Sequence, residues 1–111
     1  TVGGPSTHHL VSREVLQALG PKGIVVNIAR GTVIDEQALV ELLEQGLVGG
    51  AGLDVFEHEP KVPQALSSND QVVVLPHIGS ATNETRMDME NMLMQNIEAF
   101  FKTGKVITPI A

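Results

Sequence analysis

His77 follows a short apolar run, residues 72–75, and a proline. An apolar run of β-branched residues this short predicts a buried strand, which Pro76 ends. In open α/β sheets, ligands bind just outside the carboxyl ends of the strands, so a histidine there is placed to act as a general acid or base. The alternative is a turn histidine bonded to a nearby carbonyl. This alternative is favoured when His77 is considered without the rest of the chain.

Polar side chains also follow two other predicted strands, residues 24–28 and 49–55. They are Asn27 and Arg30 at the first strand, and Asp54, Glu57 and Glu59 at the second. If the strands are parallel and adjacent, their carboxyl ends meet at one edge. That edge would hold a cation for a substrate carboxylate, a carboxylate that accepts an amide hydrogen bond, and a histidine–glutamate pair.

Such a pair suits acid–base chemistry, because a carboxylate beside an imidazole favours the protonated ring. A positioned general acid typically contributes about 10²–10⁴-fold in rate. Each of these residues alone has an alternative as a surface charge or loop cap. Their joint appearance at strand ends favours a site.

Helical patterns separate the strands. We expect helices at residues 13–19, 36–45 and 83–102, capped by Ser12, Asp35 and Thr82 and ended by Gly20, Gly46 and Gly104, with a helical turn at 64–66. This order predicts an α/β fold with a parallel sheet covered on both faces. Three strands are few for a whole domain. We therefore expect the C-terminal half of a doubly wound, Rossmann-type sheet plus a long C-terminal helix.

Two helices carry apolar faces at helical spacing. Ala38, Leu39, Leu42 and Leu43 share one face of the second helix, and Met89, Leu93, Ile97 and Phe100 share one face of the last. We expect both faces to pack in a core. The methionines are interpreted as packing residues and not as sulfur ligands.

Composition narrows the class of protein. The 111 residues are 42% hydrophobic and 18% charged, as in globular domains, and the net charge of −6 argues against nucleic-acid or anionic-membrane partners. No apolar run approaches the roughly 20 residues of a membrane span. The chain has no cysteine, which excludes disulfides and thiolate metal sites and fits a cytoplasmic protein. It begins without Met or a signal pattern, so we expect a fragment of a longer protein.

Three linked motifs resemble, in order and separation, the signature series of the D-isomer-specific 2-hydroxyacid dehydrogenases. They are Val-Asn-Ile-Ala-Arg-Gly at 26–31, Gly-Ala-Gly-Leu-Asp-Val-Phe-Glu-His-Glu-Pro at 50–60, and Leu-Pro-His-Ile-Gly-Ser-Ala-Thr at 75–82. Within that family the chain is most similar to the glyoxylate/hydroxypyruvate reductases, including the hydroxyphenylpyruvate reductase type.

The resemblance implies hydride transfer from NAD or NADP to a small 2-keto acid such as glyoxylate or hydroxypyruvate, giving the D-2-hydroxy acid. It implies that Arg30 pairs with the substrate carboxylate, that His77 donates a proton to the keto oxygen, and that Glu59 orients His77. The implied cofactor contacts are Thr7, Ile28, Ala29, Arg30, Asp54, His77, Ile78 and Gly79. Asn27 is expected to hold the loop that aims Arg30. His58 has no implied role and is expected to be exposed.

The chain also departs from the family pattern. The Gly-x-Gly-x-x-Gly phosphate loop does not occur in it, which leaves NAD or NADP open. Gly4 and Ser6 replace a Thr and a Glu of the family's cofactor-edge loop, so Thr7 is a weak contact. His8 and His9 are interpreted as loop residues, because no carboxylate lies at a spacing that supports a metal site. No metal is therefore expected.

For the parent protein we expect residues 1–82 to be the C-terminal part of an NAD(P)-binding domain. Residues 83–111 would return towards a substrate domain, and the parent would be a homodimer. The other hypotheses are a family enzyme acting on phosphoglycerate, lactate, phosphite or formate, a nucleotide-sensing protein of the corepressor type, and an inert folding piece.

Overall fold

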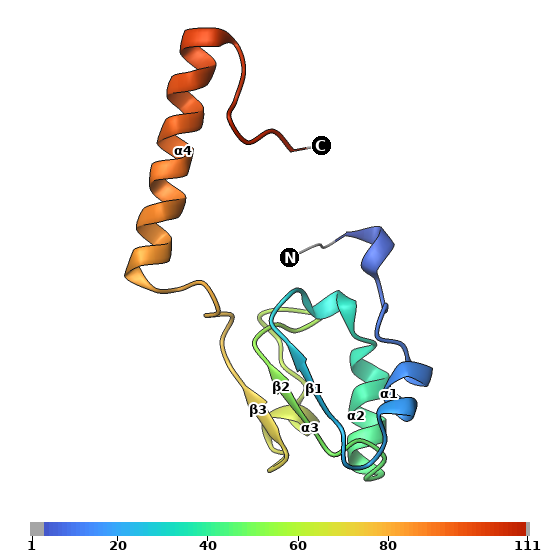
Figure 1. Cartoon of the computed structure of the whole chain (residues 1–111). Helices are drawn as coiled ribbons and strands as arrows, with labels where there is room; N and C mark the ends of the chain where they lie inside the picture. Colours follow the sequence, from blue (N-terminus) through green and yellow to red (C-terminus); the bar gives the residue numbers. More distant parts are fainter. Residues whose placement is uncertain (1–3, 111) are drawn as a thin grey trace. The chain divides into compact units, whose positions relative to one another are not determined.

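The structure, a computed structural model, describes residues 4–110. The described residues form two compact units, one ending at Gly79 and the other beginning at Ser80. The elements of the first are η1 (Pro5–Thr7), α1 (Arg13–Leu19), β1 (Ile24–Asn27), η2 (Gly31–Val33), α2 (Glu36–Glu44), β2 (Gly50–Leu53), α3 (Gln64–Ser67) and β3 (Val72–Val74); the second contains α4 (Asn83–Thr103) (Figure 1).

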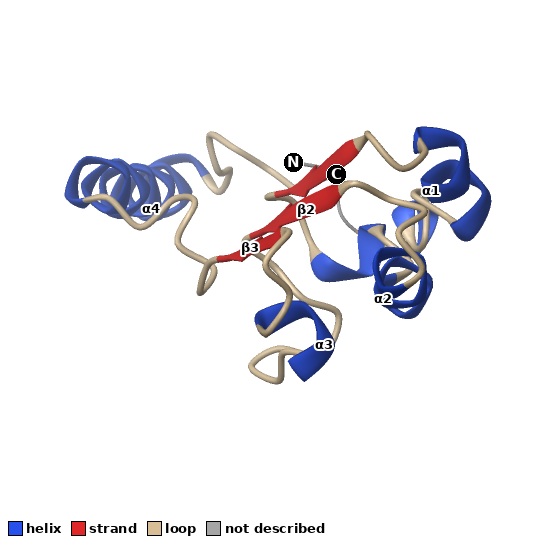
Figure 2. Cartoon of the chain, turned by 90° about the horizontal axis from the view of Figure 1, so that it is seen from below, coloured by secondary structure: helices blue, strands red, loops and turns tan. Residues whose placement is uncertain are grey.

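The three strands form one parallel sheet in the order β1-β2-β3. Ile24 lies opposite Gly50, and Ala51 lies opposite Val72. The crossovers through α2 and α3 both step the same way along the sheet. Because parallel crossovers are right-handed, both helices lie on the same face (Figure 2). The predicted α/β class and parallel sheet are confirmed.

Within the first unit, no helix covers the side of the sheet away from α2 and α3. Ile24, Val26 and Val73 point to that side and are 67%, 68% and 64% exposed. The sequence predicts cover on both faces, because the strands show little polar alternation. The first unit covers only one, since neither crossover reaches the other face.

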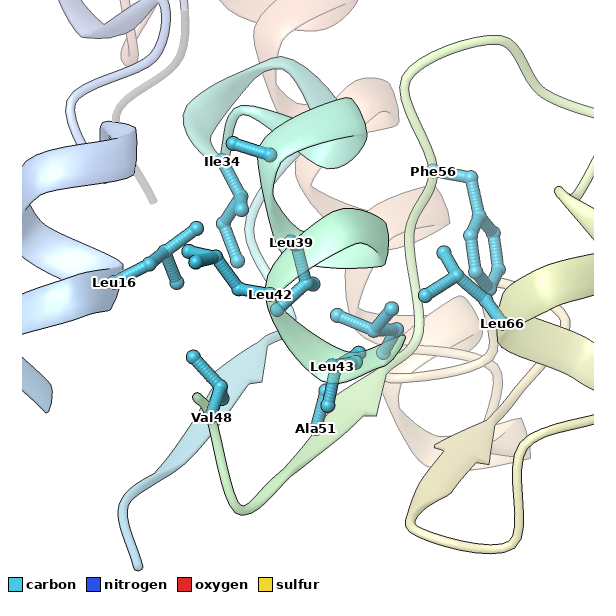
Figure 3. Close-up of a cluster of buried hydrophobic side chains, with 11 residues drawn as sticks. Leu16, Ile34, Leu39, Leu42, Leu43, Val48, Ala51, Phe56 and Leu66 are labelled. Atoms are coloured by element: carbon cyan, nitrogen blue, oxygen red, sulfur yellow. The ribbon is translucent and has the colours of Figure 1, made fainter. Parts of the chain in front are cut away.

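The core lies between the sheet and its helices (Figure 3). Its buried members are Leu16, Ile34, Ala38, Leu39, Leu42, Leu43, Val48, Ala51, Leu53, Phe56 and Leu66. They include all four residues of the apolar face predicted for the second helix. In Figure 3, Leu16 of α1 points towards α2, and Phe56 lies beside Leu66 of α3.

The strands are shorter than the predicted ranges. β1 ends at Asn27, whose Oδ1 accepts the N–H of Ala29 at 3.0 Å and turns the chain out of the strand. β2 spans four residues where seven are predicted. Side-chain bonds to the local backbone compete with the sheet ladder at such exits.

Helix α2 begins as the sequence predicts, because the Asp35 carboxylate accepts the N–H of Ala38 at 2.9 Å. α1 also begins after the predicted residue, but Ser12 does not cap it with its side chain. The hydroxyl donates to the Glu14 carboxylate at 2.6 Å instead. Gly20 then ends α1 with φ 78°, a conformation that favours glycine.

In the second unit, Thr82 caps α4 by accepting the N–H of Thr85, and Gly104 ends it in the left-handed region. Asn96 Oδ1 accepts the N–H groups of Ile107 and Thr108 at 2.8 and 3.0 Å, which fastens the following tail to the helix. The predicted core packing of this helix is not seen, because no residue of α4 is buried in the described chain. Among residues 4–110, no helix has the length and apolar character needed to cross a membrane.

We expect Leu42→Ala to lower the free energy of unfolding by about 2–5 kcal/mol, because Leu42 is only 1% exposed and its loss leaves a cavity. Leu10→Ala is the matched control: Leu10 is 66% exposed, and its loss should change stability by less than about 0.5 kcal/mol. Urea denaturation followed by circular dichroism measures both. Equal effects would contradict the assigned core.

Candidate active site

The carboxyl ends of the three strands are held side by side by hydrogen bonds that continue past the strands. The N–H of Asp54 donates to the carbonyl of Asn27 at 3.0 Å, and the N–H of Leu75 donates to the carbonyl of Leu53 at 2.8 Å. The segments that carry Arg30, Glu59 and His77 therefore leave the sheet from adjacent positions.

His77 and Glu59 form an ion pair in which Nδ1 and Oε2 are 2.8 Å apart. The other oxygen of Glu59 accepts the N–H of Phe56 at 3.0 Å, which fixes the carboxylate on its own loop. His77 has φ 56°, an uncommon backbone conformation for a residue with a side chain. The side chains are 46% and 36% exposed, so the pair is accessible to a ligand.

The pKa of the Glu59 carboxyl lies below its ordinary value. The hydrogen bond with His77 is the main cause, and the N–H of Phe56 lowers the pKa further, while burial opposes both. The positive charge of Arg30 acts in the same direction as His77, more weakly. Glu59 therefore stays ionised and keeps its partner in place in mildly acidic solution.

Arg30 is aimed by its own loop. Asn27 Nδ2 donates to the carbonyl of Arg30 at 2.9 Å, while Asn27 Oδ1 accepts the N–H of Ala29. Asn27 is buried, and it holds this loop as the sequence predicts. The Arg30 guanidinium is exposed and donates to the carbonyl of Ala29 at 2.7 Å.

An open groove of about 750 Å³ is lined by Arg30, Glu59 and His77 together, and also by Glu57 and His58. The fold thus brings together all three residues predicted to be catalytic. A second hollow, of about 330 Å³ and lined mostly by apolar side chains, also reaches Glu59 and His77. The ion pair therefore faces a polar groove and an apolar hollow.

Asp54 is 3% exposed and acts on the turn that follows His77. Its two oxygens accept the N–H groups of Ile78 and Gly79 at 2.8 and 2.7 Å. A Cβ at Gly79 would lie 2.9 Å from Asp54 Oδ2, so glycine permits this close approach. A carboxylate has further lone pairs, and Asp54 retains acceptor capacity for the cofactor contact predicted from the sequence.

The other predicted cofactor positions are accessible. Ile28 is 66% exposed and Ile78 is 47% exposed, with Ala29 half-buried and Gly79 exposed. Thr7 lies in η1, where its hydroxyl donates to the carbonyl of Gly4 at 3.0 Å. It is not among the residues that line the groove. His58 is exposed, as expected.

Sequence reasoning missed two residues that shape the loop between β2 and Glu59. Glu36 is 8% exposed, and its carboxylate accepts the N–H of Glu57 at 3.0 Å. Gly31 lets that loop approach, because a Cβ there would fall 1.9 Å from the carbonyl carbon of Phe56. The glycine directly after Arg30 was the only local signal, and both contacts arise between distant segments.

We expect Asp54→Ala to destabilise the fold by about 1–3 kcal/mol, because the N–H groups of Ile78 and Gly79 lose their acceptor. Hydrogen exchange of these two amides should accelerate. Asp70→Ala is the matched control, since Asp70 is exposed. Unchanged exchange in Asp54→Ala would contradict the assignment.

The pKa of Glu59 provides a second test. A carbon-13 NMR titration should place it below the ordinary glutamate value, and His77→Ala should raise it, whereas His58→Ala should not. Because the folded-state pKa is the lower one, the pair stabilises the fold above the pKa of the unfolded chain, and this contribution is lost as the pH falls through the folded-state value. Identical Glu59 titrations in the wild type and His77→Ala would refute His77 as the main cause of the low pKa.

The chain is similar to proteins of one known family. Residues 2–79 match the family described as D-isomer specific 2-hydroxyacid dehydrogenase, NAD binding domain. Hydroxyphenylpyruvate reductase of Plectranthus scutellarioides is 51% identical over 106 residues, which are 96% of this chain and 34% of that protein. A glyoxylate/hydroxypyruvate reductase A of Arabidopsis thaliana is 49% identical over 94% of this chain and 33% of its own length.

A similar crystal structure is that of the NADPH-dependent glyoxylate/hydroxypyruvate reductase of Sinorhizobium meliloti in complex with NADP and malonate. It is 49% identical with a TM-score of 0.96, over 100% of this chain and 35% of that one. The chain spans about a third of the length of these relatives. The parallel α/β sheet is the fold expected of an NAD-binding domain. The chain therefore belongs to the D-isomer-specific 2-hydroxyacid dehydrogenase family, in which it matches the NAD-binding domain.

Proposed function

We propose that the protein reduces a small 2-keto acid to the D-2-hydroxy acid with NADH or NADPH, and that glyoxylate and hydroxypyruvate are its substrates. The observation that carries this proposal is the groove lined by Arg30, Glu59 and His77, with His77 paired to Glu59 at 2.8 Å. The reductase names of the relatives support the same substrate class.

Arg30 would bind the substrate carboxylate and polarise the keto oxygen. Its guanidinium presents a planar fork of donors that matches a carboxylate. The group is exposed, and its present acceptor is a backbone carbonyl of the neighbouring residue, so a negatively charged ligand in the groove would compete well for it.

His77 would give a proton to the keto oxygen. Glu59 accepts from Nδ1, which leaves Nε2 as the ring atom that presents a proton to the substrate. Glu59 fixes the orientation of the ring and stabilises its positive charge. In the reverse direction the same ring would take up the hydroxyl proton.

The residues at the strand ends fit a nicotinamide cofactor. Ile28 and Ala29 after β1, and Ile78 and Gly79 after β3, offer accessible apolar surface and backbone on both sides of the Asp54 carboxylate. When bound, the nicotinamide supplies the hydride. Thr7 would contribute a weaker contact. This part of the proposal covers NAD and NADP alike.

The proposal extends to the organisation of the parent protein. Residues 1–82 would complete an NAD(P)-binding domain, residues 83–111 would pack on the substrate domain, and the parent would be a cytoplasmic homodimer. The exposed apolar side chains of α4 support a packing role, since Met89 and Leu93 are 61% and 60% exposed. Sedimentation velocity on the full-length protein tests the dimer.

We expect the full-length protein to oxidise NADH or NADPH when glyoxylate or hydroxypyruvate is added. His77→Ala should lower kcat by about 10²–10⁴-fold, because the general acid is lost. Arg30→Ala should weaken both substrate binding and turnover, since Arg30 would contact the carboxylate and the keto oxygen. Asp70→Ala is the control, because Asp70 is exposed, does not line the groove and has no role in the proposed chemistry.

An unchanged rate in His77→Ala would refute the assigned acid. A panel with phosphoglycerate, lactate, phosphite and formate separates other substrates of the family. Binding of the cofactor without turnover on any member of the panel would instead indicate a nucleotide-sensing protein.

A further inference from the structure

A second histidine–glutamate cluster shares no residue with the His77–Glu59 pair. Glu57 Oε1 is 2.7 Å from His9 Nε2 and 3.9 Å from His8 Nε2. The two imidazole rings are stacked, with centroids 3.8 Å apart and an interplanar angle of 27°, so their in-plane lone pairs run side by side. In the described chain these three residues are the one group of three or more histidine, cysteine or acidic residues whose potential ligand atoms all lie within 4.8 Å of one another.

We propose that His8, His9 and Glu57 bind a divalent transition-metal ion of the Zn²⁺ type. Two imidazoles and a carboxylate are a common donor set for such ions, which take three protein ligands and leave a further position for water. The sequence predicts no metal site, because no carboxylate lies at a spacing from the histidine pair that supports one. The fold supplies one from 48 residues away.

Binding requires small displacements of the ligand atoms and a rotation of the exposed His8 ring out of the stack, so that both lone pairs meet at the ion. Ligand atoms at about 2.1 Å from a tetrahedral ion stand about 3.4 Å apart, so His9 must retreat from Glu57 by less than about 1 Å and His8 must approach by about half that. His9 donates its Nε2 proton to Glu57 in the metal-free cluster. On binding, the ring changes tautomer: the Nε2 proton is exchanged through solvent for one on Nδ1, and the Nε2 lone pair of the neutral ring binds the ion.

Backbone contacts hold the ligands before any ion binds. The N–H of His9 donates to the carbonyl of Thr32 at 2.8 Å, and the N–H of Glu57 donates to the Glu36 carboxylate at 3.0 Å. His9 also has φ 49°; His9 and His77 are the two non-glycine residues with positive φ in the described chain. Backbone strain of this kind costs of order 1–3 kcal/mol and clusters at functional sites.

The exposure of the three side chains suits an open metal site. Glu57 is 17% exposed, His9 33% and His8 55%, so the carboxylate is sheltered while the outer imidazole faces solvent. Water can reach the remaining coordination position past His8. Glu57 lines the groove, but the proposed reduction assigns no chemical role to it or to the two histidines.

Isothermal titration of the full-length protein with ZnCl₂ tests the proposal. We expect one Zn²⁺ per chain at this site, with His8→Ala and Glu57→Gln each weakening it by roughly tenfold or more, since each removes a ligand. His58→Ala is the matched control, because this neighbouring histidine is exposed and is not in the cluster. Mg²⁺ at millimolar concentration should not compete, because it prefers oxygen ligands.

His8→Ala decides the test if Glu57→Gln alters the fold, because His8 is the most exposed of the three and circular dichroism can confirm that its variant is folded. Zn²⁺ should also raise the Tm of the wild type, EDTA should reverse this, and folded His8→Ala should show a smaller rise. Equal Zn²⁺ affinity in the wild type and His8→Ala would overturn the proposal. So would loss of binding in His58→Ala.

Discussion

The buried carboxylate of Asp54 is the contact on which the geometry of the site depends. It ends the central strand and accepts two consecutive N–H groups from the turn after His77, so the exit of β3 is bound to the exit of β2. Because the group is only 3% exposed, water competes weakly for these bonds. The positive φ of His77 lies directly before the two clamped amides, and the clamp keeps the imidazole turned towards Glu59.

The loop after β2 is also held by contacts with buried groups of other segments. Gly31 lets it approach the exit of β1, and the Glu36 carboxylate accepts the N–H of Glu57. Glu59 then needs only its own backbone contact, with Phe56, to present an oxygen to His77. The side chains of the acid–base pair are thus half-exposed, while the loops that carry them are anchored on buried polar groups. Such anchoring gives a site on loops a fixed geometry.

The sequence was sufficient to predict the parallel sheet and the partnership of Glu59 with His77. Strand-ending residues of a parallel sheet must meet at one edge, and the family motifs select Glu59 from the two nearby glutamates. The sequence could not predict what packs against α4 or against the second face of the sheet. Apolar spacing indicates that a face is to be buried, but it does not identify the segment that buries it. The contacts of Glu36 and Glu57 join segments far apart in the chain, and no local pattern encodes them.

Glu57 and Glu59 show why one loop can serve two clusters. They are two residues apart, yet Glu57 reaches His9 at 2.7 Å and Glu59 reaches His77 at 2.8 Å. Both histidines adopt the left-handed conformation, which for a side-chain-bearing residue persists only where surrounding contacts impose it. For His9 the contact is its own N–H, which donates to the carbonyl of Thr32. For His77 the contacts are the N–H groups of the next two residues, which donate to the Asp54 carboxylate. Because both glutamates leave one loop, ligation of Glu57 by a metal ion would tighten the same backbone that presents Glu59 to the groove.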